Sequence, residues 1–485
     1  MHFIDGNWRD EGSSEFVSLN PATGKPIWRG KAAGEAEVTA AVAAARAAFP
    51  GWAALAYERR HEIAKKFKEL VEARKEELAL AIAEETGKAL WDARSEASAV
   101  IAKLGFAHAA YAERTGTRSQ PSAGGTAVVR HRPHGVMAVY GPYNFPAHLP
   151  NGHIMPALLA GNTVVFKPSE QTPMVGEWMV RLWQQAGIPT GVINLLQGER
   201  HTGMALTKQA IDGVLFTGSS ATGKAIHAQF AGRPEVILAL EMGGNNPMVV
   251  SRVNDLAAAV HETLLSAFTG TGQRCTCARR LIVIDWEQSD QFIDRLVKSA
   301  EQLKTGAYNE SPEPFMGPLI SLHEANRLVA AEERLKALGG RILLPLRRPH
   351  PDLPFLTPGL IDMTGVEGVP DEEFFGPLLQ IYRVKSAEEA IALANRSQYG
   401  LSAAILCDDA DTCRHLAERI HCGILNVNRQ TTGASGSAPF GGIGLSGNHR
   451  PAGYYAADYC AYPVASVENP ALALPASLPP GMVIA

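Results

Sequence analysis

The sequence predicts an α/β protein with two parallel α/β domains and a small separate β segment, and three observations predict this class. Short apolar runs alternate with helical segments along residues 136–250, and a second block of the same kind spans residues 281–427. Apolar strands joined by helices form parallel sheets that are covered on both faces. Residues 117–134 and the tail from residue 453 fit neither block. The length of 485 residues suffices for two or three domains, each with its own core.

The first hundred residues are predicted to be mostly helical. Residues 59–88 have the 3.6-residue apolar period of an amphipathic helix, with charged residues on the other faces. The apolar stripe consists of Ile63, Phe67, Leu70, Val71 and Leu78. Gly87 stands where such a helix is expected to end. We interpret the charges of this region as a solvated helix face.

Nine apolar runs are predicted to be strands of the two blocks. In the first block they are residues 136–140, 163–166, 192–196, 213–216, 236–240 and 247–250, with helices at 173–187 and 221–230. In the second block they are residues 281–285, 402–406 and 423–427, with helices near 288–304, 321–337 and 410–420. We place the join between the two domains near Gly243–Gly244.

Composition and charge exclude several classes of function. A net charge of −4 gives no reason to expect nucleic acid or an anionic membrane as a partner. No window approaches the roughly 20 apolar residues of a membrane span, and the N-terminus carries Asp5 instead of a long apolar core. The six cysteines are sparse and unevenly spread, unlike a disulfide framework. The expected compartment is therefore the reducing cytoplasm.

Residues 216–225, FTGSSATGKA, are similar to a phosphate-binding P-loop. A P-loop needs Ser or Thr after its lysine to hold magnesium, and this chain has Ala225. Nucleotide hydrolysis is therefore a remote alternative, although LIVID (281–285) imitates the aspartate-tipped strand that accompanies a P-loop. The remaining pattern is a strand, a small-residue turn and a helix N-terminus, which suits a phosphate or pyrophosphate. An ordinary turn between strand and helix fits it equally well.

Residues 442–447, GIGLSG, match the letters of a dinucleotide-binding fingerprint but not its context. No strand leads into them, and no strand–helix–strand unit with an acidic residue about 20 positions on follows. We predict a tight loop.

Residues 270–280, GTGQRCTCARR, place Cys275 and Cys277 in a basic, glycine-flanked stretch. A Cys-x-Cys pair is a poor half-site for zinc, and a disulfide within it would be strained, so no metal site is expected. Three arginines, Arg274, Arg279 and Arg280, are expected to lower the pKa of Cys275 and to make it a nucleophile. A buried, inert cysteine is the alternative.

Residues 268–275 also resemble a particular family. The pattern F-x-x-x-G-Q-x-C is similar to the nucleophile motif of the aldehyde dehydrogenase superfamily, and further segments resemble its other motifs in the family's order. These segments are GPYNFP (141–146), FKPSE (166–170), FTGSSATG (216–223), LEMGGNNP (240–247), EEFFGPL (372–378) and PFGGIGLSG (439–447). The resemblance covers nearly the whole chain. It implies an aldehyde dehydrogenase-like α/β fold, with two Rossmann-related parallel domains and a small β oligomerisation arm.

The resemblance implies roles for three catalytic residues. Cys275 is the nucleophile that attacks the aldehyde and forms a thiohemiacetal and then a thioester. Asn144 donates its side-chain amide to the oxyanion, together with the backbone N–H of Cys275. Glu241 is the general base that activates water, which requires that burial raise its pKa towards neutrality. From the residues alone, Asn144 also fits a turn position and Glu241 the end of a strand.

The resemblance also implies an NAD site. Lys167 and Glu170 match the residues that hold the adenosine ribose. The Glu170 carboxylate disfavours the 2′-phosphate of NADP, whereas the Lys167 ammonium could bind that phosphate; we give Glu170 the greater weight and expect NAD. Glu373 matches the ligand of the nicotinamide ribose, and Phe375 is expected near the ring. The pyrophosphate turn consists of Gly218, Ser219, Ser220, Ala221, Thr222 and Gly223.

The position before the nucleophile points to the substrate. Arg274 stands where many family members have a small or sulfur-containing residue, so it is expected to bind a carboxylate of the aldehyde, with help from Arg429 and Ser435. The alternative is that Arg274 points to solvent or pairs with an acid. The predicted reaction is NAD-dependent oxidation of a carboxylated semialdehyde, with succinate or glutamate semialdehyde as alternatives. Two less favoured hypotheses are a thiol acyltransferase or hydrolase that uses Cys275 without redox chemistry, and a catalytically inactive structural protein.

The expected domain organisation follows from the same resemblance. Residues 1–116 and 135–243 are the NAD-binding domain, and residues 244–452 are the catalytic domain. Residues 117–134 and 453–485 are the oligomerisation arm and tail. Within the arm, residues 127–133 are predicted to be a strand that pairs across a subunit boundary, so a homodimer or larger homo-oligomer is expected.

Overall fold

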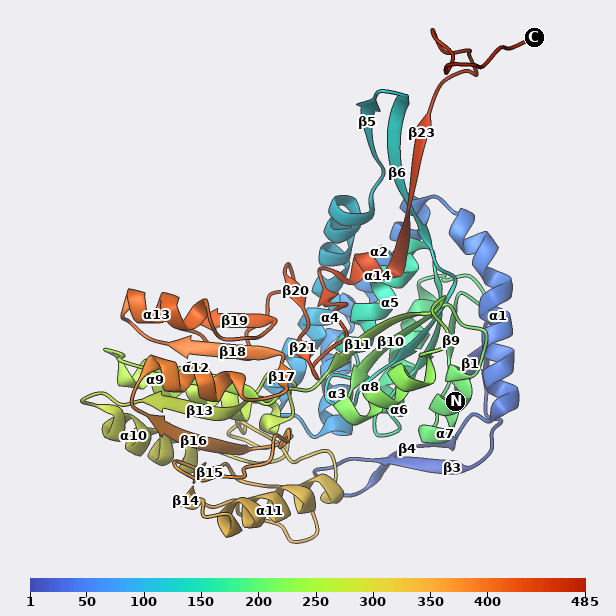
Figure 1. Cartoon of the computed structure of the whole chain (residues 1–485). Helices are drawn as coiled ribbons and strands as arrows, with labels where there is room; N and C mark the ends of the chain where they lie inside the picture. The colour runs from blue at the N-terminus through green and yellow to red at the C-terminus, as the bar shows by residue number, and fades with distance from the viewer.

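The computed structural model describes residues 1–485 and contains two α/β units, from which a small three-stranded sheet projects (Figure 1). Each α/β unit has one seven-stranded, mainly parallel sheet with its own apolar cores. The predicted fold class is confirmed. The assignment of residue ranges to an NAD-binding domain, a catalytic domain and an arm stays a prediction.

The first sheet has the strand order β11-β10-β7-β8-β9-β1-β2. Its strands are β1 (His2–Ile4), β2 (Asn7–Arg9), β7 (Val136–Tyr140), β8 (Thr163–Lys167), β9 (Ile193–Leu195), β10 (Gly213–Gly218) and β11 (Ile237–Met242). The five strands from β7 to β11 are parallel, and β1 and β2 add an antiparallel edge. Every predicted strand from 136 to 240 is present, because each is a fully apolar run buried on both faces.

Helices cover this sheet. They are α1 (Glu35–Ala54), α2 (Tyr57–Ala73), α3 (Lys75–Thr86), α4 (Leu90–Ala110), α5 (His148–Ala160), α6 (Pro173–Gln185), α7 (Arg200–Thr207) and α8 (Ser220–Gln229), with a π-helical turn at Tyr111–Thr115. The helix predicted over 59–88 is two helices, because the backbone breaks at Arg74 (φ −118°, ψ 29°). Gly87 ends α3 in the left-handed conformation (φ 78°), as predicted.

The first hundred residues are mostly helical, as predicted, but the first 31 residues contain no helix. They contain β1, β2 and an antiparallel hairpin of β3 (Glu15–Leu19) and β4 (Pro26–Lys31). The strands of the hairpin are short and largely exposed, so they lack the continuous apolar run that marks the buried strands.

The second sheet has the strand order β14-β15-β16-β13-β12-β18-β19. Its strands are β12 (Asn246–Val250), β13 (Ala278–Ile284), β14 (Arg341–Leu344), β15 (Gly359–Asp362), β16 (Leu378–Val384), β18 (Ser402–Leu406) and β19 (Ile424–Val427). Its helices are α9 (Leu256–Phe268), α10 (Ser289–Glu301), α11 (Leu322–Ala337), α12 (Ala387–Asn395) and α13 (Ala410–Ala417). The predicted strands and helices of this block are confirmed, whereas β14, β15, β16, α9 and α12 were not predicted. The strand predicted at 247–250 was assigned to the first block, but as β12 it belongs to this second sheet.

The GIGLSG stretch forms a loop, as expected. It contains only β21 (Ile443–Gly444), which pairs with β17 (Tyr399–Gly400). A second short pair, β20 (Pro439–Phe440) with β22 (Ala452–Gly453), closes the same late segment. This segment returns the chain from the second sheet to the first, since Glu241 and Gly447 form a β-bridge.

The projecting sheet has the order β23-β6-β5 and stands clear of both units (Figure 1). Its strands are β5 (Arg118–Ser122), β6 (Gly125–Pro133) and β23 (Ala461–Glu468), which follows the short helix α14 (Ala456–Cys460). The predicted strand at 127–133 exists and pairs with β23 of the same chain. No single helix of the chain is long and apolar enough to cross a membrane; α1 and α2 meet the length and composition criteria only together, with a 116° bend between them.

Candidate active site

Four predicted site residues meet at the C-terminal ends of neighbouring parallel strands. Glu241 lies near the end of β11, Gly218 ends β10, Asn144 follows β7, and Lys167 ends β8. Ligands of open parallel sheets bind outside this edge. The chain runs from β11 directly into β12 of the second sheet, so the edge lies at the junction of the two units.

The loop that carries Cys275 connects α9 to β13 through a 3₁₀ turn, Thr269–Gly272. Gly270, Thr271 and Gly272 all have left-handed backbones, with φ of 63°, 59° and 70°. A Cβ atom on Gly272 would lie 2.1 Å from the carbonyl oxygen of Gly376, so only glycine fits there. Gly270 and Gly272 therefore allow the left-handed turn of this loop, and Gly272 also allows its close approach to the segment that contains Gly376. Thr271 is held in this disfavoured conformation by packing and by a 2.9 Å hydrogen bond to the Gly317 carbonyl.

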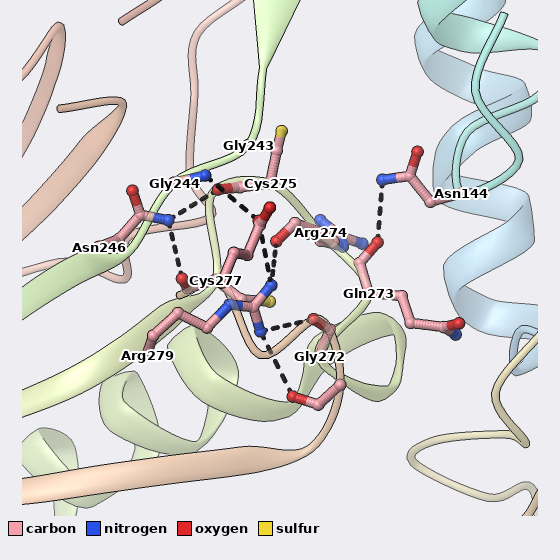
Figure 2. A network of polar contacts seen from close by, with 12 residues as sticks. Asn144, Gly243, Gly244, Asn246, Gly272, Gln273, Arg274, Cys275, Cys277 and Arg279 are labelled. Atoms are coloured by element: carbon pink, nitrogen blue, oxygen red, sulfur yellow. Dashed lines mark hydrogen bonds and ion pairs between the residues drawn. The ribbon is translucent and has the colours of Figure 1, made fainter. Parts of the chain in front are cut away.

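Asn246, at the start of β12, holds the nucleophile loop from one side (Figure 2). Its Nδ2 donates to the carbonyl oxygens of Cys275 (2.7 Å) and Cys277 (2.8 Å). Its Oδ1 accepts from the backbone N–H of Ser402 at 3.0 Å. Sequence reasoning recognised the segment that contains Asn246 but gave this residue no role.

We expect Asn246→Ala to lower the free energy of unfolding by about 2–4 kcal/mol, because two buried carbonyls and one N–H lose their partner. Urea unfolding followed by circular dichroism measures this change. Asn395→Ala is the matched control, since Asn395 also bonds two backbone groups but through hydrogen bonds that are exposed to solvent. Water can replace these bonds, so the expected cost is below about 1 kcal/mol. Equal effects of the two substitutions would contradict the bracing role.

Arg279, in β13, holds the loop from the other side (Figure 2). Its fully buried guanidinium donates to the carbonyls of Gly272 (2.7 Å), Arg274 (2.9 Å) and Gly376 (3.3 Å). It also lies 3.7 Å from the Glu373 carboxylate. Arg279 thus links the nucleophile loop to the segment that carries Glu373.

The other two arginines do not serve Cys275 as the sequence interpretation expected. Arg274 forms a buried ion pair with Asp92 of α4. The guanidinium of Arg280 is used in hydrogen bonds to the backbone carbonyls of Asn245, Leu393 and Ala394. Both groups are therefore held by partners within the fold.

The expectation of a lowered pKa at Cys275 is wrong. Burial, together with the nearby carboxylates of Glu373 and Glu241, raises the pKa of the Cys275 thiol to about 12. Arg279 lowers this pKa, but by less than burial raises it. These effects favour the protonated thiol of Cys275 over the thiolate. Its half-buried side chain is free of any disulfide, like the other five cysteines.

Asn144 reaches the nucleophile loop from the first unit (Figure 2). Its side chain is 7% exposed, and Nδ2 donates to the backbone carbonyl of Gln273 at 2.9 Å. Gln273 is itself fixed, because its Oε1 accepts from the N–H of Ile320 at 3.0 Å. The amide of Asn144 is therefore hydrogen-bonded to the residue that stands two positions before Cys275.

Glu241 lines a cavity of about 200 Å³. One carboxylate oxygen accepts from the N–H of Ala452 at 3.2 Å, and the other has no hydrogen-bond partner. Burial raises the pKa of Glu241 well above its ordinary value, and the Ala452 hydrogen bond opposes this only in part. The direction of this shift is the one that a general base near neutral pH needs.

Lys167 and Glu170 lie together at the end of β8. The buried Nζ of Lys167 donates to the carbonyls of Pro168 (2.8 Å) and Gly198 (2.7 Å) and lies 4.0 Å from the Glu170 carboxylate. Burial lowers the pKa of Lys167 to about 8, against the opposing effect of Glu170 and Glu199. The Glu170 side chain is 43% exposed, so its carboxylate is accessible to a ligand.

Residues 218–223 form the turn between β10 and α8. Ser219 caps α8, its Oγ accepting from the N–H of Thr222 at 3.2 Å, and Ser220 is hydrogen-bonded to the Tyr399 hydroxyl at 2.9 Å. A Cβ atom on Gly223 would lie 2.3 Å from the sulfur of Met242, so glycine lets helix and strand pack closely. The other N–H groups of this first turn have no partner within the helix, and a helix N-terminus of this kind suits a phosphate.

Glu373 and Phe375 precede β16 and face the same junction. The Glu373 carboxylate accepts from the N–H of Gly244 at 3.2 Å, and a Cβ atom on Gly243 would lie 1.8 Å from it. Burial raises the pKa of Glu373, and Arg279 opposes this rise. The ring of Phe375 packs edge-on against Tyr143, with centroids 6.1 Å apart.

The three residues predicted to bind the substrate do not come together. The guanidinium of Arg274 is paired with Asp92, Arg429 is exposed, and Ser435 lines the cavity that also contains Glu241. Of the three, only Ser435 faces that cavity.

Comparison with known proteins identifies the protein family. A profile of the aldehyde dehydrogenase family matches residues 8–463, and the chain belongs to this family. Among its relatives are the N-succinylglutamate 5-semialdehyde dehydrogenases of Burkholderia ambifaria and Burkholderia mallei. Each is 54% identical over 481 residues, which cover 99% of this chain and 99% of the relative.

Solved structures of aldehyde dehydrogenases have the same fold as this chain. PnpE in complex with nicotinamide adenine dinucleotide superposes with a TM-score of 0.90 at 32% identity, over 96% of both chains. Methylmalonate-semialdehyde dehydrogenase from Oceanimonas doudoroffii superposes with a TM-score of 0.92 at 26% identity, over 97% of this chain and 98% of the other.

Proposed function

We propose that this chain oxidises N-succinylglutamate 5-semialdehyde to N-succinylglutamate with NAD, as a step of arginine catabolism in the cytoplasm. The observation that carries the chemistry is the meeting of Cys275, Asn144 and Glu241 at one junction, from three separate segments of the chain. The choice of aldehyde is supported by 54% identity over the full length to enzymes named for this substrate. Succinate and glutamate semialdehyde are the other candidates of the same class.

In the first half of the reaction, the sulfur of Cys275 forms a bond to the aldehyde carbon. The thiol proton is released to solvent as this bond forms, so that Glu241 remains free to act in the later water step. The negative oxygen of the thiohemiacetal accepts hydrogen bonds from the Asn144 amide and the backbone N–H of Cys275. A nicotinamide dinucleotide held by Lys167, Glu170, the 218–223 turn and Glu373 would supply the hydride acceptor that the conversion of the thiohemiacetal into a thioester requires.

In the second half, Glu241 acts on water. Its buried carboxylate takes a proton from a water molecule, whose oxygen attacks the thioester carbon. The bond from carbon to the sulfur of Cys275 breaks, the acid is released, and the thiol is regenerated. Asn144 stabilises the oxyanion of this step as well.

The chain offers a cradle that fits a dinucleotide. Lys167 and Glu170 would hold the adenosine ribose, the 218–223 turn the pyrophosphate, and Glu373 the second ribose, with Phe375 beside the nicotinamide ring. The hydrogen bonds that Lys167 donates to two carbonyls engage it within the fold, so it is less available to a 2′-phosphate. The exposed carboxylate of Glu170 would repel that phosphate.

We expect Glu170→Gln to raise kcat/KM with NADP relative to NAD by about tenfold or more, because a like-charge contact worth about 1.4 kcal/mol or more is removed. Initial rates with the two cofactors measure this ratio. Glu69→Gln, an exposed change on α2, is the control and leaves the ratio unchanged. An unaltered ratio in Glu170→Gln would contradict the assignment of the ribose site.

The function is tested by NADH formation with a panel of aldehydes. The proposal expects the highest kcat/KM with N-succinylglutamate 5-semialdehyde, and a lower value with succinate semialdehyde, glutamate semialdehyde and propanal. Equal activity on propanal would remove the claim of carboxylate recognition. We further propose a homodimer or larger homo-oligomer, since β5 is exposed along its whole length and leaves an unpaired strand edge.

A further inference from the structure

The cavity that Glu241 lines also contains a lysine with no role in the proposed mechanism. Lys103 lies in α4, is 7% exposed and lines this cavity. Its Nζ makes no hydrogen bond or ion pair within the chain, and burial alone lowers the pKa of Lys103 to about 8. A buried ammonium without a partner costs free energy, so its presence calls for an explanation.

The other buried cations of this region have acidic partners. Lys88 pairs with Glu96 at 2.6 Å, and Arg274 pairs with Asp92. Both acids lie on α4, four residues apart, and the spacing of seven from Glu96 places Lys103 on the same helix face. This face thus supplies a carboxylate for each of the other two cations and none for Lys103.

The remaining ionisable groups of the cavity wall do not neutralise Lys103. His153 is hydrogen-bonded through both ring nitrogens, at 2.8 and 3.1 Å. Burial and the charge of Lys103 lower the pKa of His153 to about 3 and that of His148 well below its ordinary value, so both rings are neutral. Glu241 is the one carboxyl group on this wall, and no ion pair joins it to Lys103.

The ammonium also lies next to α5. Gly152 lies opposite it, and a Cβ atom at Gly152 would approach Nζ to 3.7 Å. Phe106 and the late loop close another side of the cavity, since a Cβ atom on Gly436 would lie 2.4 Å from the Phe106 ring. The cavity therefore has a cation in one part of its wall and the catalytic base in another.

We propose that Lys103 binds a carboxylate of the substrate and is the residue that selects aldehydes carrying negative charge. The proposal rests on the proposed function, because a carboxylated semialdehyde brings the anion that Lys103 lacks while its aldehyde end reaches Cys275 and Glu241. Lys103 takes the role that the sequence interpretation gave to Arg274, whose charge is already matched by Asp92. The bond to the substrate is charge-assisted and formed away from water, which makes it strong.

The test compares Lys103→Met with the wild-type enzyme on N-succinylglutamate 5-semialdehyde and on uncharged propanal. For the carboxylated substrate we expect KM to rise by about 10- to 100-fold with kcat changed less than about threefold, which is the loss of one charged hydrogen bond. For propanal, kcat/KM is expected to stay within about twofold. Lys103→Arg keeps the charge and is expected to retain most of the affinity.

Two further measurements separate this role from a structural one. Without substrate, Lys103→Met is expected to melt at the same or a higher temperature, because it removes an unpaired buried charge. Lys66→Met, on the exposed face of α2, is the control for loss of one lysine and leaves both KM values unchanged. If Lys103→Met does not fold, Lys103→Gln replaces it in every comparison.

The inference is overturned if Lys103→Met loses equal activity on both aldehydes, or if its KM for the carboxylated substrate is unchanged. Failure of the proposed function looks different: the wild-type enzyme would then not oxidise N-succinylglutamate 5-semialdehyde at all. In that case succinate semialdehyde serves as the anionic substrate against propanal, and the role of Lys103 is decided on that pair.

Discussion

Replacing Cys275 by serine is expected to lower kcat by at least about 10³-fold, the largest effect of any single change in this chain. A serine hydroxyl keeps the size and hydrogen-bonding capacity of the thiol but is a far weaker nucleophile. The pKa of Cys275 is already raised by burial, so the site gives no strong help in ionising a still weaker acid. Steady-state NADH formation with N-succinylglutamate 5-semialdehyde measures the loss.

Cys277→Ser is the matched control for this substitution. Cys277 is fully buried, and its thiol donates to the carbonyl of Thr269 at 3.6 Å, so it is engaged within the fold. We expect activity within about threefold of the wild-type enzyme. If Cys277→Ser were the inactive variant and Cys275→Ser the active one, the nucleophile would be misassigned.

Replacing Glu241 by glutamine is expected to slow steady-state turnover by about 10²- to 10⁴-fold while an initial burst of NADH is retained. The burst survives because attack and hydride loss come before the water step, and the thioester then accumulates on Cys275. Stopped-flow absorbance resolves the two phases. Loss of the burst together with turnover would mean that the principal role of Glu241 is not deacylation.

The pH dependence follows from the same residue. Since burial raises the pKa of Glu241, its carboxyl group stays protonated, and unable to accept a proton from water, up to a higher pH than an ordinary glutamate. Turnover limited by the water step should therefore rise with pH through this pKa. Glu241→Gln should lose this rise, because glutamine does not titrate. A turnover that falls with rising pH would contradict the sign of the shift.

The fold was predictable where the sequence is most regular. The strands of the first sheet from β7 to β11 are continuous apolar runs, and parallel sheets buried on both faces require such runs. The hairpin of β3 and β4 was missed, because exposed strands carry no such pattern. The break at Arg74 was missed as well, since the apolar stripe continues across it.

The candidate site was also predictable only in part. Cys275, Asn144 and Glu241 were named because their local motifs resemble those of a family. The bracing by Asn246 joins parts of the chain that are up to 156 residues apart, and no local pattern reveals such contacts. The pKa of Cys275 was expected to shift in the wrong direction, because the chain sequence displays the nearby arginines but not the partners that hold them.

The role proposed for Lys103 also could not be predicted from the sequence. In the sequence it is one charged residue in a helix, which usually means a solvated face. Its burial results from the packing of α4 against α5 and the late loop, and its isolation results from the pairing of Asp92 and Glu96 with other cations. Only the three-dimensional arrangement reveals an unpaired ammonium in the wall of the cavity that Glu241 also lines.

The most direct test of the account is mass spectrometry of Glu241→Gln enzyme quenched after mixing with NAD and N-succinylglutamate 5-semialdehyde. We predict that the peptide containing Cys275 carries an N-succinylglutamyl thioester, and that peptide mapping places the acyl group on Cys275 and not on Cys277. An enzyme that forms NADH without any acyl adduct, or that carries the adduct on another residue, would contradict the proposed mechanism.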